Sequence, residues 1–384
     1  MKKRVLATIM SATLVVSMLA GCGSAATTEA PAAEAAPATE AAADAAPAAD
    51  TASGDKLSFK IVVKSFQSSY WQAAVQGVNQ AADKLQVEVE CNGPNAESDI
   101  ADQVNMLTNY INGKPDGIGL AACDQSACLD ALQMAKDAGI PVVCFDSGCP
   151  DAPEGSVLST IATDNYGAGA TAAENMYAAL KDTIANASAP VRIGEVNQES
   201  TSESITQRGL GFIDKFAELA AADGKKVAVV GNEYYVNAAK DKGEEATADV
   251  ILEVAVPAQT TVELCATEAS AIMNKSDVLG IFGSNQVAAE GILSADENLG
   301  KLGSKAGENI LGVGFDAGSI IKAAVKDGKM FGAVTQSPLA MGRTTVETLY
   351  AITQGESVSD VATDGYWYDS TNMDSDDIAP NLYD

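Results

Sequence analysis

Short runs rich in β-branched residues alternate with longer stretches of helical periodicity along most of this chain. The candidate strands lie at residues 59–65, 87–92, 117–122, 141–146, 191–197, 226–231, 250–256, 278–285, 310–316 and 332–336. The candidate helices lie near residues 71–85, 99–111, 126–138, 168–180, 207–219, 260–274, 287–298, 318–325 and 340–353. An alternation of this kind predicts parallel strands that are covered by helices on both faces.

The number of candidate strands favours two sheets over one. About ten strands are at the limit of a single doubly wound sheet, and they fall into an early and a late series on either side of Asp164. No glycine-rich phosphate turn of the GxGxxG or GxxxxGK[ST] type follows a candidate strand, so the sequence carries no signature of a nucleotide-binding sheet. The pattern therefore predicts an α/β fold with two Rossmann-like lobes.

The first residues have the pattern of a bacterial signal peptide. Residues 2–4 are basic and residues 5–19 are mostly apolar, a stretch shorter than the roughly 20 residues of a membrane-spanning helix. The stretch ends in Leu-Ala-Gly-Cys at residues 19–22, which resembles the lipobox of bacterial lipoproteins. The resemblance implies that residues 1–21 are removed and that Cys22 carries a diacylglycerol. An ordinary signal peptide with an incidental cysteine is the alternative.

A segment of low complexity follows this cysteine. Between Gly23 and Gly54 the chain consists almost entirely of Ala, Pro, Thr, Ser, Glu and Asp, without an aromatic residue, Lys or Arg. Such a composition cannot bury a hydrophobic core. We expect residues 22–56 to form a flexible tether with a reach of about 30 Å, which attaches an extracytoplasmic protein to the membrane, as on a Gram-positive-type cell surface.

Charge and composition exclude several classes of function. The formal net charge of −28 makes nucleic acid a poor partner. The chain has no histidine, which excludes histidine-based catalysis and histidine metal sites. It also lacks the GxSxG elbow of serine hydrolases. We therefore expect no enzymatic activity, no cofactor and no metal site.

Six cysteines remain besides Cys22, and four of them are close in sequence. An exported chain permits disulfides, but the spacing does not identify pairs, and free thiols are equally consistent. The connectivity stays open for Cys91, Cys123, Cys128, Cys144, Cys149 and Cys265.

Polar residues collect where candidate strands end, which is where open parallel sheets bind ligands. Asp146, Asn285, Asp316 and Gln336 each end a strand, and Asp124 follows another; Lys64, Ser68, Tyr70 and Trp71 lie at the first strand-to-helix turn. Carboxylates and amides hydrogen-bond vicinal hydroxyls, and aromatic rings pack on the C–H faces of a ring-shaped polyol. The combination predicts a site for a sugar or cyclitol. Helix capping by the acidic and amide residues, and core packing by Tyr70 and Trp71, are the alternatives.

Six sequence segments occur in an order that resembles a known family. They are KPDGI at 114–118, AGIPVVCFD at 138–146, IATDN at 161–165, QRGLGF at 207–212, GSN at 283–285 and VGFD at 313–316. Over residues 57–360 the chain is similar to the ribose- and galactose-type sugar-binding proteins of ABC importers, which have the type I periplasmic-binding-protein fold. The resemblance implies two lobes with parallel sheets joined by a three-segment hinge.

The resemblance also implies lobe boundaries and ligand contacts. The N-terminal lobe would comprise residues 57–163 and 337–365, and the C-terminal lobe residues 164–336 and 366–384, with crossings near 163–165, 336–338 and 366–373. By the same matching, Arg208 has a structural role, with a ligand contact as the alternative. The expected ligand-binding residues are Lys64, Ser68, Tyr70, Trp71, Asp146, Ser147, Thr206, Gln259, Asn285, Asp316 and Gln336.

The chain differs from the family pattern at positions that bear on which ligand it binds. Ribose binders carry arginines where this chain has Ser147 and Thr206, and a serine where it has Lys64. Ribose is therefore not specified, and pentoses, hexoses, cyclitols, nucleosides and signalling furanoses remain open. An insertion within residues 217–258 forms either an extra strand and helix or a lid.

These observations together predict a monomeric, lipid-anchored solute-binding protein. We expect it to capture a small neutral sugar or polyol in a cleft between the lobes and to deliver it to an ABC permease in the membrane. A ligand-sensing receptor subunit and a binder of a nucleoside or another non-sugar molecule are the alternatives. The sequence does not distinguish transport from sensing.

Overall fold

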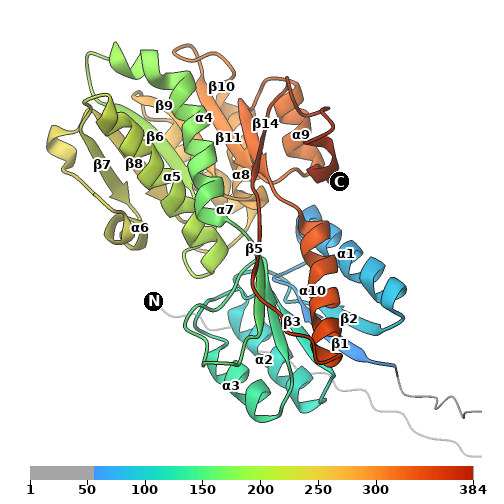
Figure 1. Cartoon of the computed structure of the whole chain (residues 1–384). Helices are drawn as coiled ribbons and strands as arrows, with labels where there is room; N and C mark the ends of the chain where they lie inside the picture. Colours follow the sequence, from blue (N-terminus) through green and yellow to red (C-terminus); the bar gives the residue numbers. More distant parts are fainter. Residues whose placement is uncertain (1–55, 384) are drawn as a thin grey trace, which may run out of the picture. The chain divides into compact units, whose positions relative to one another are not determined.

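A computed structural model of the chain describes residues 56–383 (Figure 1). The predicted signal peptide, the lipidated Cys22 and nearly all of the predicted tether lie outside these residues. Within them, no helix combines the length and apolar character that a membrane span requires.

Strands and helices alternate along the described chain as the sequence predicts. The strands are β1 (Ser58–Val62), β2 (Glu88–Asn92), β3 (Gly117–Leu120), β4 (Val142–Phe145), β5 (Ser159–Thr163), β6 (Val191–Val196), β7 (Val227–Gly231), β8 (Val250–Ala255), β9 (Val278–Gly283), β10 (Leu302–Gly303), β11 (Ile310–Phe315), β12 (Gly332–Thr335), β13 (Val361–Thr363) and β14 (Tyr366–Tyr368). The helices are α1 (Ser69–Leu85), α2 (Ile100–Asn112), α3 (Leu129–Asp137), α4 (Asn165–Ala185), α5 (Glu203–Ala222), α6 (Glu233–Ala238), α7 (Val262–Met273), α8 (Gln286–Leu299), α9 (Ser319–Lys326) and α10 (Pro338–Thr353), with short 3₁₀ turns η1 (Glu245–Thr247) and η2 (Ala379–Asn381).

The described strands form two separate sheets. The first has the order β13-β5-β4-β3-β1-β2, and all of its strand pairs are parallel. The second has the order β14-β12-β11-β9-β6-β8-β7, with β10 paired to β11. Its strands are parallel except for β14, which runs antiparallel to β12. The α/β fold with two parallel-sheet lobes is thereby confirmed.

Both faces of each sheet bury a hydrophobic core. In β1, Phe59 and Ile61 pack toward α1 and α10, whereas Val62 packs on the opposite face with residues of α2 and α3. The second sheet is covered in the same way, by α4 and α5 on one face and by α7, α8 and α9 on the other. This two-sided burial explains why the central strands read as continuous apolar runs.

The chain passes between the two sheets three times. It leaves the first sheet after β5 and enters α4, and it returns after β12 through α10, which packs beside α1 although the two are far apart in sequence (Figure 1). It leaves again between Thr363 and Tyr366, just before the predicted third stretch of residues 366–373. The exact lobe boundaries stay a prediction.

The insertion within residues 217–258 extends the second sheet. It contributes the edge strand β7, which pairs with β8, and the short helix α6. Tyr235 of α6 is buried, and its hydroxyl donates to the backbone oxygen of Glu199. The segment therefore belongs to the body of this sheet.

Candidate functional site

Side chains from both sheets meet beyond the carboxyl ends of the strands. They enclose a cavity of only about 20 Å³. The lining residues are Lys64, Ser68, Tyr70, Trp71, Glu97 and Asp146 from the first sheet's side and Ser204, Ile205, Arg208, Asn285, Gln286, Asp316 and Gln336 from the second's. We call this group the binding cleft.

Two buried aspartates occupy equivalent positions in the two sheets. Asp146 follows β4 and its backbone N–H donates to Ile161 of β5; Asp316 follows β11 and donates to Val334 of β12. Both have positive φ, +60° for Asp146 and +74° for Asp316. This conformation is uncommon for a residue other than glycine, and such strained residues cluster at ligand sites.

Each aspartate accepts hydrogen bonds from its own lobe. Asp146 accepts from the Tyr70 hydroxyl at 2.5 Å, and its other oxygen lies 3.6 Å from Lys64 Nζ. Asp316 accepts from Gln336 Nε2 at 2.8 Å and from the backbone N–H of Gln286 at 2.9 Å. Burial raises the pKa of Asp316, and the positive charge of Arg208 partly opposes this rise.

Lys64 connects the two lobes across the cleft. Its ammonium group donates to Ser202 Oγ at 3.0 Å and to Ser204 Oγ at 3.1 Å. Burial by itself lowers the pKa of Lys64, but the carboxylates of Asp146, Glu97 and Glu199 outweigh it, and the pKa is raised. Lys64 is therefore a charged donor in a buried position.

Glu97 forms a second connection between the lobes. Its carboxylate accepts from Trp71 Nε1 at 2.8 Å and from Gln198 Nε2 at 2.7 Å. Burial raises the pKa of Glu97, and the charge of Lys64 opposes the rise. Glu97 is not among the predicted site residues, because it lies five positions beyond Asn92, the end of β2. Its position shows that the loop after a strand, and not only the last strand residue, can supply a side chain to the cleft.

Arg208 lines the cleft while several protein groups hold its guanidinium. It donates to Asn165 Oδ1 at 3.0 and 2.9 Å and to the backbone oxygen of Ser284 at 2.9 Å. The guanidinium also lies 3.9 Å from the centre of the Phe315 ring. These contacts agree with the structural role expected for Arg208. The residue also lines the cleft. Ser204, Ile205 and Gln286 are further lining residues that the sequence analysis did not identify.

Most of the expected site residues meet in the cleft, and three do not line its cavity. Ser147 accepts from the backbone N–H of Ser204 at 3.3 Å, so it contacts the opposite lobe. The Thr206 hydroxyl donates to backbone oxygens of its own helix, α5. Gln259 is exposed in the loop after β8. The eight that line the cavity are Lys64, Ser68, Tyr70, Trp71, Asp146, Asn285, Asp316 and Gln336.

The capping alternative applies to some strand-end residues only. Asn285 lines the cleft and also caps α8, since its side chain accepts from the backbone N–H of Ala288 at 3.0 Å. Asp124 accepts from the N–H groups of Ser126 and Ala127 and stays outside the cleft. Trp71 belongs to α1 and packs in the core of the first sheet, as the packing alternative predicts; it also lines the cavity and donates from its indole N–H to Glu97.

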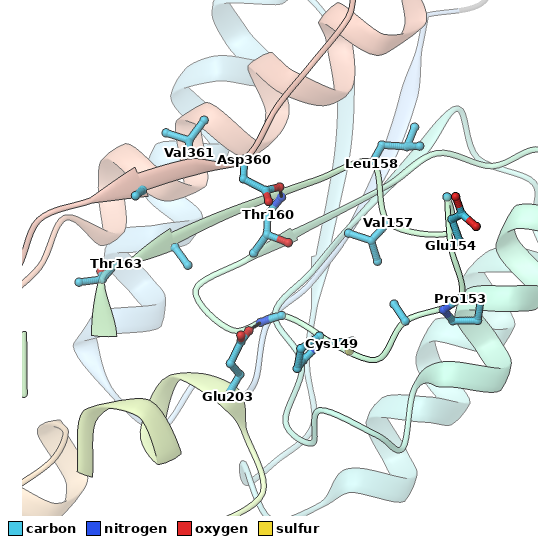
Figure 2. A pocket seen from close by; sticks show the side chains of 16 residues that line it. Cys149, Pro153, Glu154, Val157, Leu158, Thr160, Thr163, Glu203, Asp360 and Val361 are labelled. Atoms are coloured by element: carbon cyan, nitrogen blue, oxygen red, sulfur yellow. Dashed lines mark hydrogen bonds between the residues drawn. The ribbon is translucent and has the colours of Figure 1, made fainter. Parts of the chain in front are cut away.

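A larger hollow of about 630 Å³ lies beside β5 and β13 (Figure 2). Two of its three acidic side chains, those of Glu203 and Asp360, are already engaged by backbone groups. Glu203 accepts from the N–H of Gly148 at 3.0 Å, and Asp360 accepts from the N–H of Thr160 at 2.7 Å. Because buried charged and amide side chains from both lobes converge in the smaller cleft, that cleft is the candidate site.

The six cysteines of the described chain are free thiols. Burial raises the pKa of Cys91 to about 11 and that of Cys265 to about 12. Raised pKa values keep these groups protonated and unreactive. Within residues 56–383, no group of Cys, Asp and Glu side chains could hold a metal ion.

Two parallel-sheet lobes with a buried polar cleft at their strand ends define a two-lobed solute-binding protein. The chain belongs to the periplasmic binding protein domain family, whose pattern matches residues 59–357. The family resemblance found in the sequence is thereby confirmed.

Curated relatives and solved structures agree with this assignment. The chain is similar to the ribose import binding protein RbsB of Bacillus subtilis (strain 168), with 24% identity over 80% of this chain and 85% of that protein. RbsB of Escherichia coli (strain K12) is 26% identical over 79% of this chain and 87% of that protein.

Two solved structures match this chain over nearly the whole length of their own chains. One is an ABC transporter solute-binding protein from Agrobacterium vitis with bound D-fucose (27% identity, TM-score 0.69, 85% of this chain and 100% of that chain). The other is described as an ABC transporter, LacI family transcriptional regulator, from Brachyspira murdochii (32% identity, TM-score 0.68, 86% and 99%). Since its relatives are binding proteins, the chain is a binding protein and not an enzyme.

Proposed function

We propose that this protein captures a small neutral sugar or polyol in the binding cleft and delivers it to an ABC importer. The observation that carries the proposal is the pair Asp146 and Asp316. They are buried in equivalent strained positions at the strand ends of two sheets, and both line one cavity. Carboxylates in such a pair can each accept hydrogen bonds from neighbouring hydroxyls of a ligand held between the lobes.

The other lining groups support a polyol ligand. Lys64, Arg208 and Gln336 supply donors, and Asn285 supplies both a donor and an acceptor. Tyr70 and Trp71 supply apolar ring surface that suits the C–H face of a sugar. A small molecule with several hydroxyls and no net charge satisfies this mixture best.

The charges of the cleft disfavour an anionic solute. Three carboxylates, Glu97, Asp146 and Asp316, line it against two cations, Lys64 and Arg208. Lys64 is already close to Asp146. A phosphate or carboxylate ligand would therefore add negative charge to a buried site that has no free cation to balance it.

The relatives support a sugar ligand and an importer as partner. The Agrobacterium vitis protein holds D-fucose, and the Bacillus subtilis relative is a ribose import binding protein. For this chain the sugar stays open, because Ser147 and Thr206 stand where ribose binders carry arginines. Extracytoplasmic location follows from delivery to an importer, and lipid anchoring through Cys22 follows from the lipobox.

If Cys22 carries the anchor, a Cys22→Ser variant produced in a bacterial host should leave the membrane fraction, whereas Cys91→Ser should remain in it.

A thermal-shift screen tests the proposed function. The panel contains D-ribose, D-arabinose, D-fucose, D-galactose, myo-inositol and ribose 5-phosphate. A ligand at 100 times its dissociation constant adds about 2.7 kcal/mol to the free energy of unfolding. We expect at least one neutral compound to raise Tm and ribose 5-phosphate to have no effect. Unchanged Tm with every neutral compound, or a shift with the phosphate alone, would contradict the proposal.

A further inference from the structure

The segment that follows β14 returns to one of the crossings between the sheets. Asn381 is held there twice: Thr335 Oγ1 donates to its backbone oxygen at 2.8 Å, and Ser337 Oγ donates to its side-chain oxygen at 2.6 Å. Thr335 and Ser337 flank Gln336, which lines the binding cleft. This anchoring places the next residues, Leu382 and Tyr383, beside the cleft.

Tyr383 contacts both lobes. Its ring lies edge-on to the ring of Tyr70, with centres 6.0 Å apart. It packs against the core of the first sheet that contains Tyr70 and also against the core of the second sheet that contains Tyr368. Leu382 packs against the second core only. Tyr383 is therefore the residue of this segment that bridges the lobes.

The hydroxyl of Tyr383 points to the second aspartate of the cleft. It accepts from the backbone N–H of Ala317, the residue directly after Asp316, at 3.3 Å, and it lies within the electrostatic influence of the Asp316 carboxylate. Burial and the negative charge of Asp316 raise the pKa of Tyr383 well above its usual value, so the hydroxyl stays protonated and can donate.

These contacts connect the two aspartates behind the cavity. Asp146 accepts from the Tyr70 hydroxyl, the Tyr70 ring packs on the Tyr383 ring, and the Tyr383 hydroxyl lies near Asp316. We propose that Tyr383 is a positioning residue of the binding cleft, which holds the Tyr70–Asp146 pair of one lobe and Asp316 of the other in the arrangement that binds the sugar. This proposal rests on the proposed function of the cleft.

A general packing role of the segment is the competing explanation, and Leu382 separates the two. Leu382→Ala removes apolar contacts next to Tyr383 without touching Tyr70 or Asp316. If the segment only covers the core, Leu382→Ala and Tyr383→Ala should both lower Tm and leave the affinity of the folded protein unchanged. If Tyr383 positions the cleft, Tyr383→Ala should weaken binding about tenfold or more, and Leu382→Ala should not.

The pH dependence of binding provides a readout that packing does not affect. Tyr383→Phe keeps the ring but removes the hydroxyl group that lies near the Asp316 carboxylate. The pKa of Asp316 should then rise further, because a polar donor near a carboxylate stabilises its charged form. Binding that requires the ionised carboxylate should therefore decline at a higher pH on the acid side. Tyr110→Phe is the matched control, since that hydroxyl donates to Glu90 on the surface.

The experiment is calorimetric titration across acidic to neutral pH, with the neutral panel compound that raises Tm most. The proteins are the unsubstituted chain, Tyr383→Ala, Tyr383→Phe, Leu382→Ala, Tyr110→Phe and Asp146→Ala. We expect weaker binding for Tyr383→Ala, an acid limb shifted to higher pH for Tyr383→Phe, and unchanged affinity for Leu382→Ala and Tyr110→Phe.

The outcomes separate this proposal from the function on which it rests. Native affinity and an unshifted acid limb in both Tyr383 variants, together with lost binding in Asp146→Ala, would overturn the role of Tyr383 alone. Equal losses of affinity in Leu382→Ala and Tyr383→Ala would also overturn it. Native affinity in Asp146→Ala, or no response to any neutral compound, would refute the cleft as the sugar site and this proposal with it.

Discussion

At the residue scale, Asp146 and Asp316 combine three features that are rarely found together. Each is nearly fully buried, each has positive φ, and each has a hydrogen-bond donor from a neighbouring side chain. Holding a non-glycine residue at positive φ costs free energy of order 1 kcal/mol. Backbone hydrogen bonds to the neighbouring strands hold both aspartates in this conformation. Residues held in such conformations are common at ligand-binding sites.

Replacing either aspartate should therefore affect binding more than folding. A hydrogen bond to a charged group contributes roughly 1.5 to 3 kcal/mol, so Asp146→Ala and Asp316→Ala should each weaken sugar binding by about tenfold to a hundredfold. Calorimetric titration beside a denaturant melt measures both quantities. Near-native affinity with reduced stability in both variants would instead indicate a purely structural role.

A second prediction at this scale concerns Glu195, a buried residue of β6. One of its oxygens accepts from Asn197, and the other has no partner in the described chain. Burial raises the pKa of Glu195 well above its usual value. The native state then keeps a proton that the unfolded chain releases, so this group lowers the stability as pH rises from the unfolded pKa toward the native one.

Glu195→Gln should remove this pH dependence. The variant should be more stable than the unsubstituted protein at about pH 8, by roughly 1 to 3 kcal/mol, because its amide does not need to take up a proton when the chain folds. The difference should shrink toward about pH 4, where the carboxyl group is protonated in both states. Urea melts across this range measure the effect, with the exposed Glu88→Gln as control. A variant that is less stable at every pH would contradict the prediction.

At the scale of elements, the irregular strands escaped the sequence analysis for a physical reason. Strand β5 contains three Ser or Thr residues among five, so it lacks an apolar run, and its place in the sheet depends on pairing with β4 and β13. Strands β13 and β14 have three residues each. Such short segments become strands because they pair with strands that are distant in sequence. A local periodic pattern does not predict this pairing.

The contact between α1 and α10 depends on glycine at the crossing point. A Cβ atom on Gly342 would lie 2.0 Å from the backbone oxygen of Ala74, and one on Gly77 would lie 1.9 Å from that of Leu339. Gly342→Ala should therefore force the helices apart and lower the free energy of unfolding by about 1 to 3 kcal/mol. A urea melt measures this loss. The control Gly113→Ala has φ of −75° and a nearest atom at 3.3 Å, so it should cost much less; equal effects would refute the helix-crossing argument.

At the scale of the whole described body, the cleft is too small for a sugar to enter. A cavity of about 20 Å³ holds about one water molecule. Hydrogen bonds from Lys64 to Ser202 and Ser204 and from Gln198 to Glu97 join the two sides. Entry of a ligand therefore requires the lobes to separate, and the three crossings are the segments about which they can move.

Ligand binding should accordingly change the dimensions of the molecule. Because a ligand enters only when the lobes are apart, we expect the free protein in solution to be more open than this structure. X-ray scattering should then give a smaller radius of gyration at saturating sugar than without it, since the ligand joins the two lobes through Asp146 and Asp316. The Asp146→Ala variant serves as control and should show no contraction at the same concentration. If saturation leaves the radius of the unsubstituted protein unchanged, the three crossings do not act as a hinge.

The sequence by itself determined the parallel α/β architecture, because buried strands and amphipathic helices each leave a local periodic pattern. It also indicated Asp146, Asn285, Asp316 and Gln336, since the strand-end rule needs only the positions of strands in the chain. Only the tertiary structure decided which of the candidates face one cavity, and it added Glu97, Gln286 and Tyr383 while leaving Gln259 outside. These outcomes depend on loop conformation and on contacts between residues far apart in the chain, such as Tyr70 with Tyr383, and no local pattern encodes such contacts.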